Sequence, residues 1–188
     1  MKSISFLSVW ILFFIFQTIH TSAKSKPNII YLMLDEWGYF ESGHMGSTDL
    51  ITPNIDQFAS EGMRFTNAYA GAPVCGPTRC SLLTGLHAGN MSMRVNNGHS
   101  PIRTDEPTLA SILKTKRYAT GGFGKWGIGG RGTTGVPEKH GFDLFFGYYD
   151  QVHAHTFYPS YLIKNSEEVP LPGNSGTSFY EGKTHAQL

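Results

Sequence analysis

The segment NIIYLML, residues 28–34, is a nearly continuous apolar run that ends on Asp35 and Glu36. Apolar residues at successive positions over this length are typical of a strand that is buried on both faces of a parallel sheet. We therefore predict a buried parallel strand over residues 28–34. Because ligands gather at the carboxyl ends of the strands in such sheets, the strand's polar end is a candidate ligand site.

Helical and extended segments alternate after this strand. Thr52 followed by Pro53 predicts a helix N-terminus, and MRFTNAY, residues 63–69, alternates with period two as strands do. Pro77 predicts the start of a short helix that Gly85 would end.

A further helix is predicted over residues 108–116, and YATGGF, residues 118–123, predicts a glycine-rich strand that delivers Lys125 at its end. The alternation of helix and strand predicts an α/β fold with a mostly parallel sheet flanked by helices.

Three polar features follow predicted strands and would meet at one edge of the sheet: Asp35-Glu36, the loop around Cys75, and Lys125. Each has an ordinary alternative, since paired acids often form a solvated turn and lysines are mostly at the surface. Together they fit one kind of chemistry. Adjacent carboxylates favour Ca²⁺ or Mg²⁺, and a helix N-terminus favours an anion.

Arg79 lies four residues after Cys75, one helical turn away, so its guanidinium can reach back toward that position. Lys125 adds a mobile point charge for a tetrahedral anion. The combination of cation, helix terminus, arginine and lysine predicts a site for a sulfate or phosphate ester.

Both cysteines of the chain lie in PVCGPTRCSLLTG, residues 73–85. A disulfide between Cys75 and Cys80 is disfavoured because their side chains diverge on an emerging helix. No C-x-x-C pair or neighbouring histidine pair completes a metal site. Cys75 therefore needs another role, and we expect Cys80 to be a small packed residue.

The N-terminus predicts export. Lys2 precedes the short apolar run FLSVWILFFIF, and small residues at Thr21 and Ala23 follow, as in a cleaved signal peptide over residues 1–23. The run is shorter than the roughly 20 residues of a membrane span. A buried N-terminal helix or an uncleaved anchor is the alternative. We expect a secreted or periplasmic protein with no stable membrane association, and the net charge of +1 gives no indication of nucleic acid as a partner.

PVCGPTRCSLLTG resembles the signature of the type I sulfatases, which belong to the alkaline-phosphatase superfamily. Supporting segments are also similar to the family's motifs and run from about residue 27 to at least residue 172. They are PNIIYLMLDEWG, TPNIDQFASEGMRFTNAYAGAPVC, GKW at residues 124–126 and KHGFDLFFG at residues 139–147.

The resemblance implies that a separate formylglycine-generating enzyme oxidises Cys75 to Cα-formylglycine, whose hydrate is the nucleophile. One hydroxyl of the hydrate attacks sulfur and the ester alcohol leaves; the second hydroxyl then loses its proton and expels sulfate. Arg79 and Lys125 would be the catalytic partners of Cys75 in this scheme. Asp35, Glu36 and Cys75 would bind the metal, Ca²⁺ or Mg²⁺.

Two departures from the family pattern are visible. Gly127 replaces the histidine of Gly-Lys-Trp-His, which in the family hydrogen-bonds the formylglycine.

In QVHAHTFYP, residues 151–159, the resemblance points to Gln151, His153 and His155 as substrate-binding residues. The histidine pair would alternatively lie on an exposed strand face or form a metal pair.

The second departure is length, because family members supply further metal and sulfate ligands later in their chains. We therefore expect residues 24–188 to be the N-terminal part of a sulfatase catalytic domain, incomplete at the C-terminus and inactive alone. The substrate would be a sulfated small molecule or carbohydrate. The alternatives are a formylglycine-dependent phosphonate or phosphate ester hydrolase and a non-catalytic secreted binding protein of the same fold.

Overall fold

The computed structural model describes residues 26–96, 100–156, 158–174 and 176. The chain divides into two compact units, Met1–Tyr39 and Phe40–Leu188. The predicted signal segment, residues 1–23, lies outside the described residues. Among the described residues, no helix has the length and apolar character needed to cross a membrane.

In the first unit, the prediction of a buried strand over residues 28–34 is wrong. These residues form no strand, and Ile30 is 92% exposed. A strand exists only where a neighbouring backbone takes up its N–H and C=O groups, and an apolar sequence alone does not supply that neighbour. The segment does end in a marked change of direction, since Glu36 adopts a φ of 54°.

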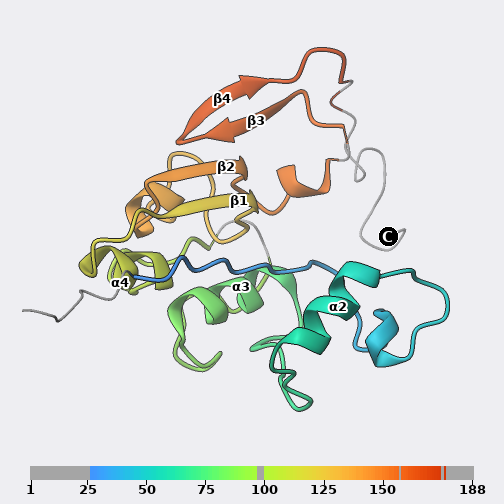
Figure 1. Cartoon of the computed structure of the whole chain (residues 1–188). Helices are drawn as coiled ribbons and strands as arrows, with labels where there is room; N and C mark the ends of the chain where they lie inside the picture. Colours follow the sequence, from blue (N-terminus) through green and yellow to red (C-terminus); the bar gives the residue numbers. More distant parts are fainter. Residues whose placement is uncertain (1–25, 97–99, 157, 175, 177–188) are drawn as a thin grey trace, which may run out of the picture. The chain divides into compact units, whose positions relative to one another are not determined.

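The second unit contains a four-stranded sheet with the strand order β1-β2-β3-β4 (Figure 1). The strands are β1 (Gly121–Lys125), β2 (Leu144–Tyr148), β3 (Tyr161–Lys164) and β4 (Glu167–Pro170). The predicted glycine-rich strand that ends on Lys125 is thus confirmed as β1. The predicted strand over residues 63–69 is wrong, because that segment is irregular in the structure.

The α/β class is confirmed, but the prediction of a mostly parallel sheet is wrong, because the pairing of the described strands is mostly antiparallel. β1 and β2 are parallel, whereas the pairs β2–β3 and β3–β4 are antiparallel. The reason for the β3–β4 pairing is local. Asn165 and Ser166 form a two-residue connection with φ angles of 46° and 68°, as in the tight hairpin turns that only antiparallel strands allow. The Asn165 side chain also fixes this hairpin to β2, because its Oδ1 accepts a hydrogen bond from Phe145 N at 2.8 Å.

The predicted helices are present. They are α2 (Pro53–Glu61), α3 (Cys75–Thr84) and α4 (Leu109–Thr115). α3 begins two residues before Pro77 and ends, as predicted, at Gly85, whose φ of 69° is left-handed. Thr108 caps α4, with its side chain accepting from Ser111 N at 3.1 Å.

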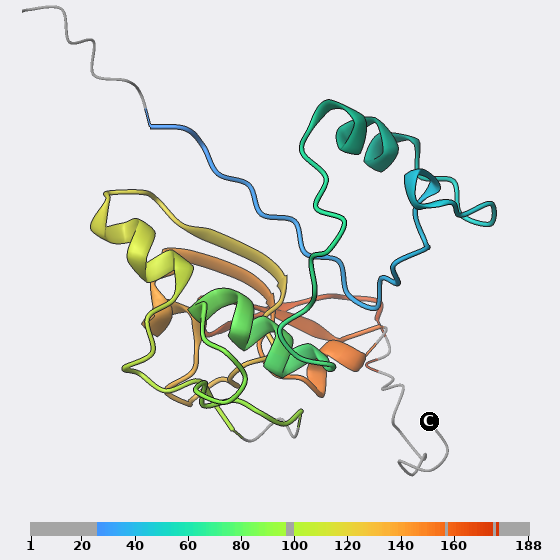
Figure 2. The ribbon, with the colours of Figure 1, turned by 90° about the horizontal axis from the view of Figure 1, so that it is seen from below.

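A buried cluster joins α3 to the sheet. Its aromatic centre is Trp126, whose ring meets those of Phe142 and Phe145 edge-on at centroid distances of 5.5 and 5.8 Å. Cys80 of α3 and Ile163 of β3 belong to the same cluster. Figure 2, the view from below, shows α3 in front of the strands. This core therefore holds the start of α3 and the end of β1 in one packed body.

Candidate active site

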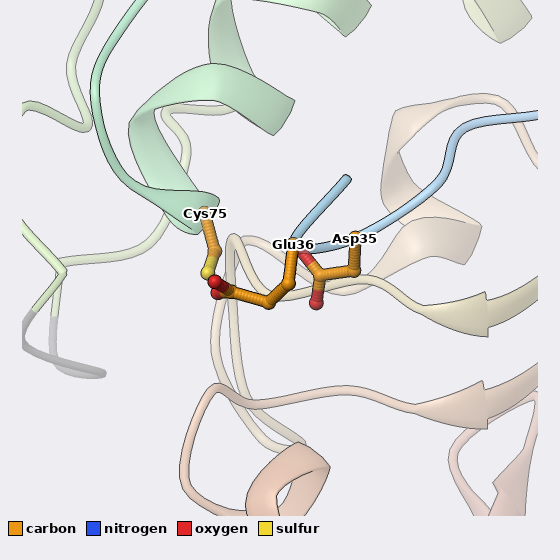
Figure 3. A group of neighbouring side chains, drawn as sticks. All are labelled: Asp35, Glu36 and Cys75. Atoms are coloured by element: carbon orange, nitrogen blue, oxygen red, sulfur yellow. The ribbon is translucent and has the colours of Figure 1, made fainter. Parts of the chain in front are cut away.

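The two cysteines differ sharply in environment. Cys80 is fully buried, and this burial raises the pKa of its thiol, so it stays protonated and unreactive. Cys75 is the first residue of α3 and is partly exposed (Figure 3). Neither cysteine is part of a disulfide. The structure therefore confirms Cys80 as a packed residue and leaves Cys75 as the cysteine that can meet a ligand.

The residue after Cys75 holds the start of α3 close to the end of β1. Gly76 N donates a hydrogen bond to Asn96 Oδ1 at 3.2 Å. A Cβ on Gly76 would lie 2.6 Å from Met93 Cε and 3.2 Å from Gly127 O, so no larger residue fits without displacing a neighbour. Asn96 had no recognisable signal in the sequence, since it lies 20 residues from its partner.

Arg79 links α3 to β1 directly. Its side chain is buried, with only 8% of the residue exposed, and its Nη1 donates to the carbonyl oxygen of Lys125 at 2.5 Å. Hydrogen bonds from a charged guanidinium are stronger than those from a neutral donor. The bond to Lys125 O therefore fixes the position of the Arg79 guanidinium. The Arg79 side chain and the Lys125 backbone are therefore in contact in the second unit, and a shared role of the two residues in one site stays a prediction.

Gly127 lies next to the side chains of Arg79 and Lys125. It has a φ of 74°, and a Cβ at this position would lie 3.3 Å from Arg79 Cδ and 3.7 Å from Lys125 Cε. The same Cβ would lie 3.2 Å from Gln151 Oε1. Gln151, which follows β2 in the chain, is thus brought to the same small space as Arg79 and Lys125.

The two predicted substrate-binding histidines form part of a short 3-10 helix, His153–His155, and not of a strand. His155 Nδ1 donates to the backbone oxygen of Gln151 at 2.6 Å, and His153 Nε2 donates to that of Tyr161 at 3.1 Å. Each histidine therefore supports the backbone with one ring nitrogen.

A hollow of about 320 Å³ opens beside this helix. Its lining includes Asp150, His153 and Tyr161. The His153 ring lies against that of Tyr161, with a centroid distance of 4.5 Å. Substrate binding by the two histidines stays a prediction.

Asp35 and Glu36 belong to the first unit, and both are exposed. Each offers a carboxylate oxygen as a ligand atom, whereas Cys75 offers its sulfur; Figure 3 draws these three side chains. The carboxylates suit a hard cation such as Ca²⁺ or Mg²⁺. A metal site that joins them to Cys75 of the second unit stays a prediction.

A model of the Sulfatase family matches residues 27–181 of the chain. The chain belongs to the sulfatase family. Human arylsulfatase D is 40% identical over 141 residues, which cover 68% of this chain and 24% of that protein. The N-acetylgalactosamine-6-O-sulfatase of Bacteroides thetaiotaomicron is 41% identical over 176 residues, covering 85% of this chain and 33% of that protein.

Solved structures agree with this assignment. A structure of BT4656 in complex with its substrate D-glucosamine-2-N,6-O-disulfate superposes with a TM-score of 0.65 at 28% identity, covering 79% of this sulfatase chain and 28% of the other. The chain thus spans only about a quarter to a third of the length of these relatives, 24% and 33% for the two named above.

Proposed function

We propose that the protein hydrolyses sulfate esters and that residues 24–188 are the N-terminal part of its catalytic domain. The observation that carries this proposal is the hydrogen bond from Arg79 to the Lys125 carbonyl, on the same helix that begins at Cys75. Two cations beside the N-terminal end of a helix make an anion site, and the chain belongs to the sulfatase family.

Cys75, once converted to Cα-formylglycine by a separate formylglycine-generating enzyme, is the proposed nucleophile. Arg79 and Lys125 hold the sulfate group and stabilise the negative charge on its oxygens as the ester bond breaks. Because Arg79 is fixed by its bond to Lys125 O, it needs little reorganisation when the substrate binds.

The proposed metal is Ca²⁺ or Mg²⁺, held by Asp35, Glu36 and the converted Cys75. When bound, it would supply a positive charge that polarises the sulfate group. The chemistry of the donors favours conversion of the cysteine. Hard cations prefer oxygen over a thiolate, and conversion replaces the sulfur of Cys75 with oxygen.

The proposed substrate is a sulfated small molecule or carbohydrate. Two relatives support the carbohydrate class, since one is named for an N-acetylgalactosamine sulfate and another was solved with a sulfated glucosamine. We also propose that residues 1–23 are a signal peptide and that the protein is secreted or periplasmic, which would bring it to such substrates.

The test uses the full-length protein, produced together with a formylglycine-generating enzyme. Mass spectrometry of the peptide over residues 72–79 measures conversion of Cys75 to the aldehyde. Hydrolysis is measured with an aryl sulfate and the matching aryl phosphate, before and after chelation of divalent metal. We expect conversion, a preference for the sulfate, and loss of activity on chelation that Ca²⁺ or Mg²⁺ restores.

Two cysteine variants complete the test. Cys75→Ala should lower kcat by about 10³-fold or more, as removal of a nucleophile does. Cys80→Ala is the matched control and should keep catalysis while lowering stability, because Cys80 is fully buried in the core. A Cys75→Ala protein as active as the parent would overturn the proposal. Faster turnover of the phosphate would indicate a phosphate ester hydrolase, and an unmodified Cys75 without turnover would indicate a binding protein.

A further inference from the structure

The helix that begins at Cys75 has no cap from the residue before it. α3 follows Val74, whose apolar side chain makes no cap hydrogen bond. The first backbone N–H groups of a helix have no partner within the helix, and a cap side chain usually accepts from the second or third of them. In α3 the second of these groups is Gly76 N, which donates to Asn96 Oδ1 at 3.2 Å. Asn96 therefore supplies the missing cap from 20 residues away in the chain.

The loop over residues 86–96, which follows α3 and carries Asn96, is itself held by the core. Met91 and Met93 are buried, with 0% and 1% of each residue exposed. Between them, Ser92 donates from its backbone N and from its Oγ to Glu106, whose own exposed fraction is only 4%. Hydrogen bonds to a carboxylate are stronger than those between neutral groups. The loop is therefore fixed shortly before Asn96.

The same loop meets the start of α3 at a second point. A Cβ on Gly76 would lie 2.6 Å from Met93 Cε, so the Gly76 backbone is packed against the loop as well as bonded to it. Gly76 adjoins Cys75, and any shift of its backbone also moves the residue before it. The loop therefore sets the position from which the side chain of residue 75 projects. A reacting group misplaced by 1 Å can lose about 10²-fold in rate.

We propose that Asn96 is a positioning residue for the nucleophile at Cys75. By accepting from Gly76 N, it fixes the backbone of the first turn of α3. The side chain at position 75 is then kept in place relative to Arg79 and Lys125. Asn96 acts through the backbone of α3 and not through contact with the substrate. The proposal rests on the proposed sulfatase function and adds to it a residue that lies outside the sequence motifs.

Two other roles for Asn96 make different predictions. A cap that only stabilises the fold would affect the free energy of unfolding and leave the turnover of each folded molecule unchanged. A side chain that binds the substrate would affect KM. A positioning residue affects kcat with KM nearly constant, because the substrate still binds but the nucleophile is misplaced in the transition state. Restoring the acceptor oxygen should then restore kcat.

The experiment compares Asn96→Leu, Asn96→Asp and Asn90→Leu in the full-length protein, produced together with a formylglycine-generating enzyme. Leucine has nearly the shape of asparagine but no acceptor, whereas aspartate keeps the oxygen and is an equally good cap. Asn90 is the matched control. It is exposed on the same loop, in a turn where its backbone N, and not its side chain, donates to His87 O.

Three quantities are measured for each protein. Mass spectrometry gives the formylglycine content, so that kcat is expressed per converted molecule. Hydrolysis of an aryl sulfate gives kcat and KM. Amide hydrogen exchange of the peptide over residues 75–84 reports how firmly the first turn of α3 is held, whether or not the protein is active.

We expect Asn96→Leu to lower kcat by about 10-fold, with KM within about 2-fold of the parent, and to speed exchange in the α3 peptide. Asn96→Asp should recover kcat to within about 3-fold of the parent. Its added negative charge would raise KM for an anionic substrate, so the recovery is judged on kcat. Asn90→Leu should match the parent in kcat, KM and exchange. If Asn96→Leu does not fold, Asn96→Ala, which also lacks the acceptor, takes its place.

Three results would overturn the inference. They are a parent-level kcat in Asn96→Leu, a loss of kcat with unchanged amide exchange, and a kcat in Asn96→Asp as low as in Asn96→Leu. Failure of the proposed function looks different. There the converted parent would hydrolyse no sulfate ester, and faster exchange in Asn96→Leu would still support the hold of Asn96 on the start of α3.

Discussion

Replacement of Gly127 by alanine tests whether the space between Arg79, Lys125 and Gln151 is the reaction site. Gly124, three residues earlier, is the matched control. Both glycines have a left-handed backbone, with φ angles of 74° and 94°, but a Cβ at Gly124 meets nothing within 4 Å. Both variants therefore carry the free-energy cost of a left-handed backbone, but only Gly127→Ala also crowds neighbouring side chains.

The backbone cost is about 1–2 kcal/mol for each variant, the usual penalty for an L-residue in the left-handed region. Crowding affects only Gly127→Ala. Its Cβ would lie 3.2 Å from Gln151 Oε1 and 3.3 Å from Arg79 Cδ, so one of these side chains must move by a few tenths of an ångström. Arg79 cannot move freely, because its Nη1 is bonded to Lys125 O at 2.5 Å.

A misplacement of 1 Å can cost about 10²-fold in rate, so a shift of a few tenths should lower kcat/KM by about 3- to 10-fold. Gly124→Ala should change kcat/KM by less than about 2-fold, since it displaces no group of the site. The assays are urea unfolding and aryl sulfate hydrolysis on the full-length protein. Equal losses of kcat/KM in the two variants, or full activity in Gly127→Ala, would refute the reasoning.

Two further predictions concern stability. Thr108→Ala should lower the free energy of unfolding by about 2–3 kcal/mol, because the buried Thr108 hydroxyl caps Ser111 N and also donates to His140 O at 2.5 Å. Urea unfolding measures this, and Ser111→Ala, which keeps the bond to His140 O, should cost less; an equal cost would contradict the assignment. Burial lowers the pKa of His140 below its ordinary 6.5, so the unfolded chain binds a proton more readily than the native state as pH falls below 6.5. The stability that the neutral His140 contributes is therefore present above pH 6.5 and is lost toward lower pH. Between pH 7.5 and 5, the unfolding free energy of His140→Gln should fall less steeply than that of the parent. An identical slope in the two proteins would exclude His140 as the source of the fall.

The helices and their ends were predictable because their signals are local. Pro53 at the first turn of α2, Thr108 before α4 and Gly85 after α3 act within a few residues of themselves. The strands were less predictable. Residues 28–34 are as apolar as a buried strand but pair with no neighbour among the described residues, whereas β3 and β4 pair because of a two-residue turn.

The amino-acid sequence was enough to predict which chemical groups the candidate site holds. It named Cys75 as the distinctive cysteine, placed Arg79 one helical turn later, and put Lys125 at the end of a strand, because these relations are written in short spacings. Two features became visible only in the folded chain. Gln151 Oε1 lies next to Gly127, beside the side chains of Arg79 and Lys125, and His153 and His155 bond to backbone oxygens. Contacts between residues far apart in the sequence depend on how the core packs β1, β2 and α3 together. The spacing of residues along the chain does not predict that packing.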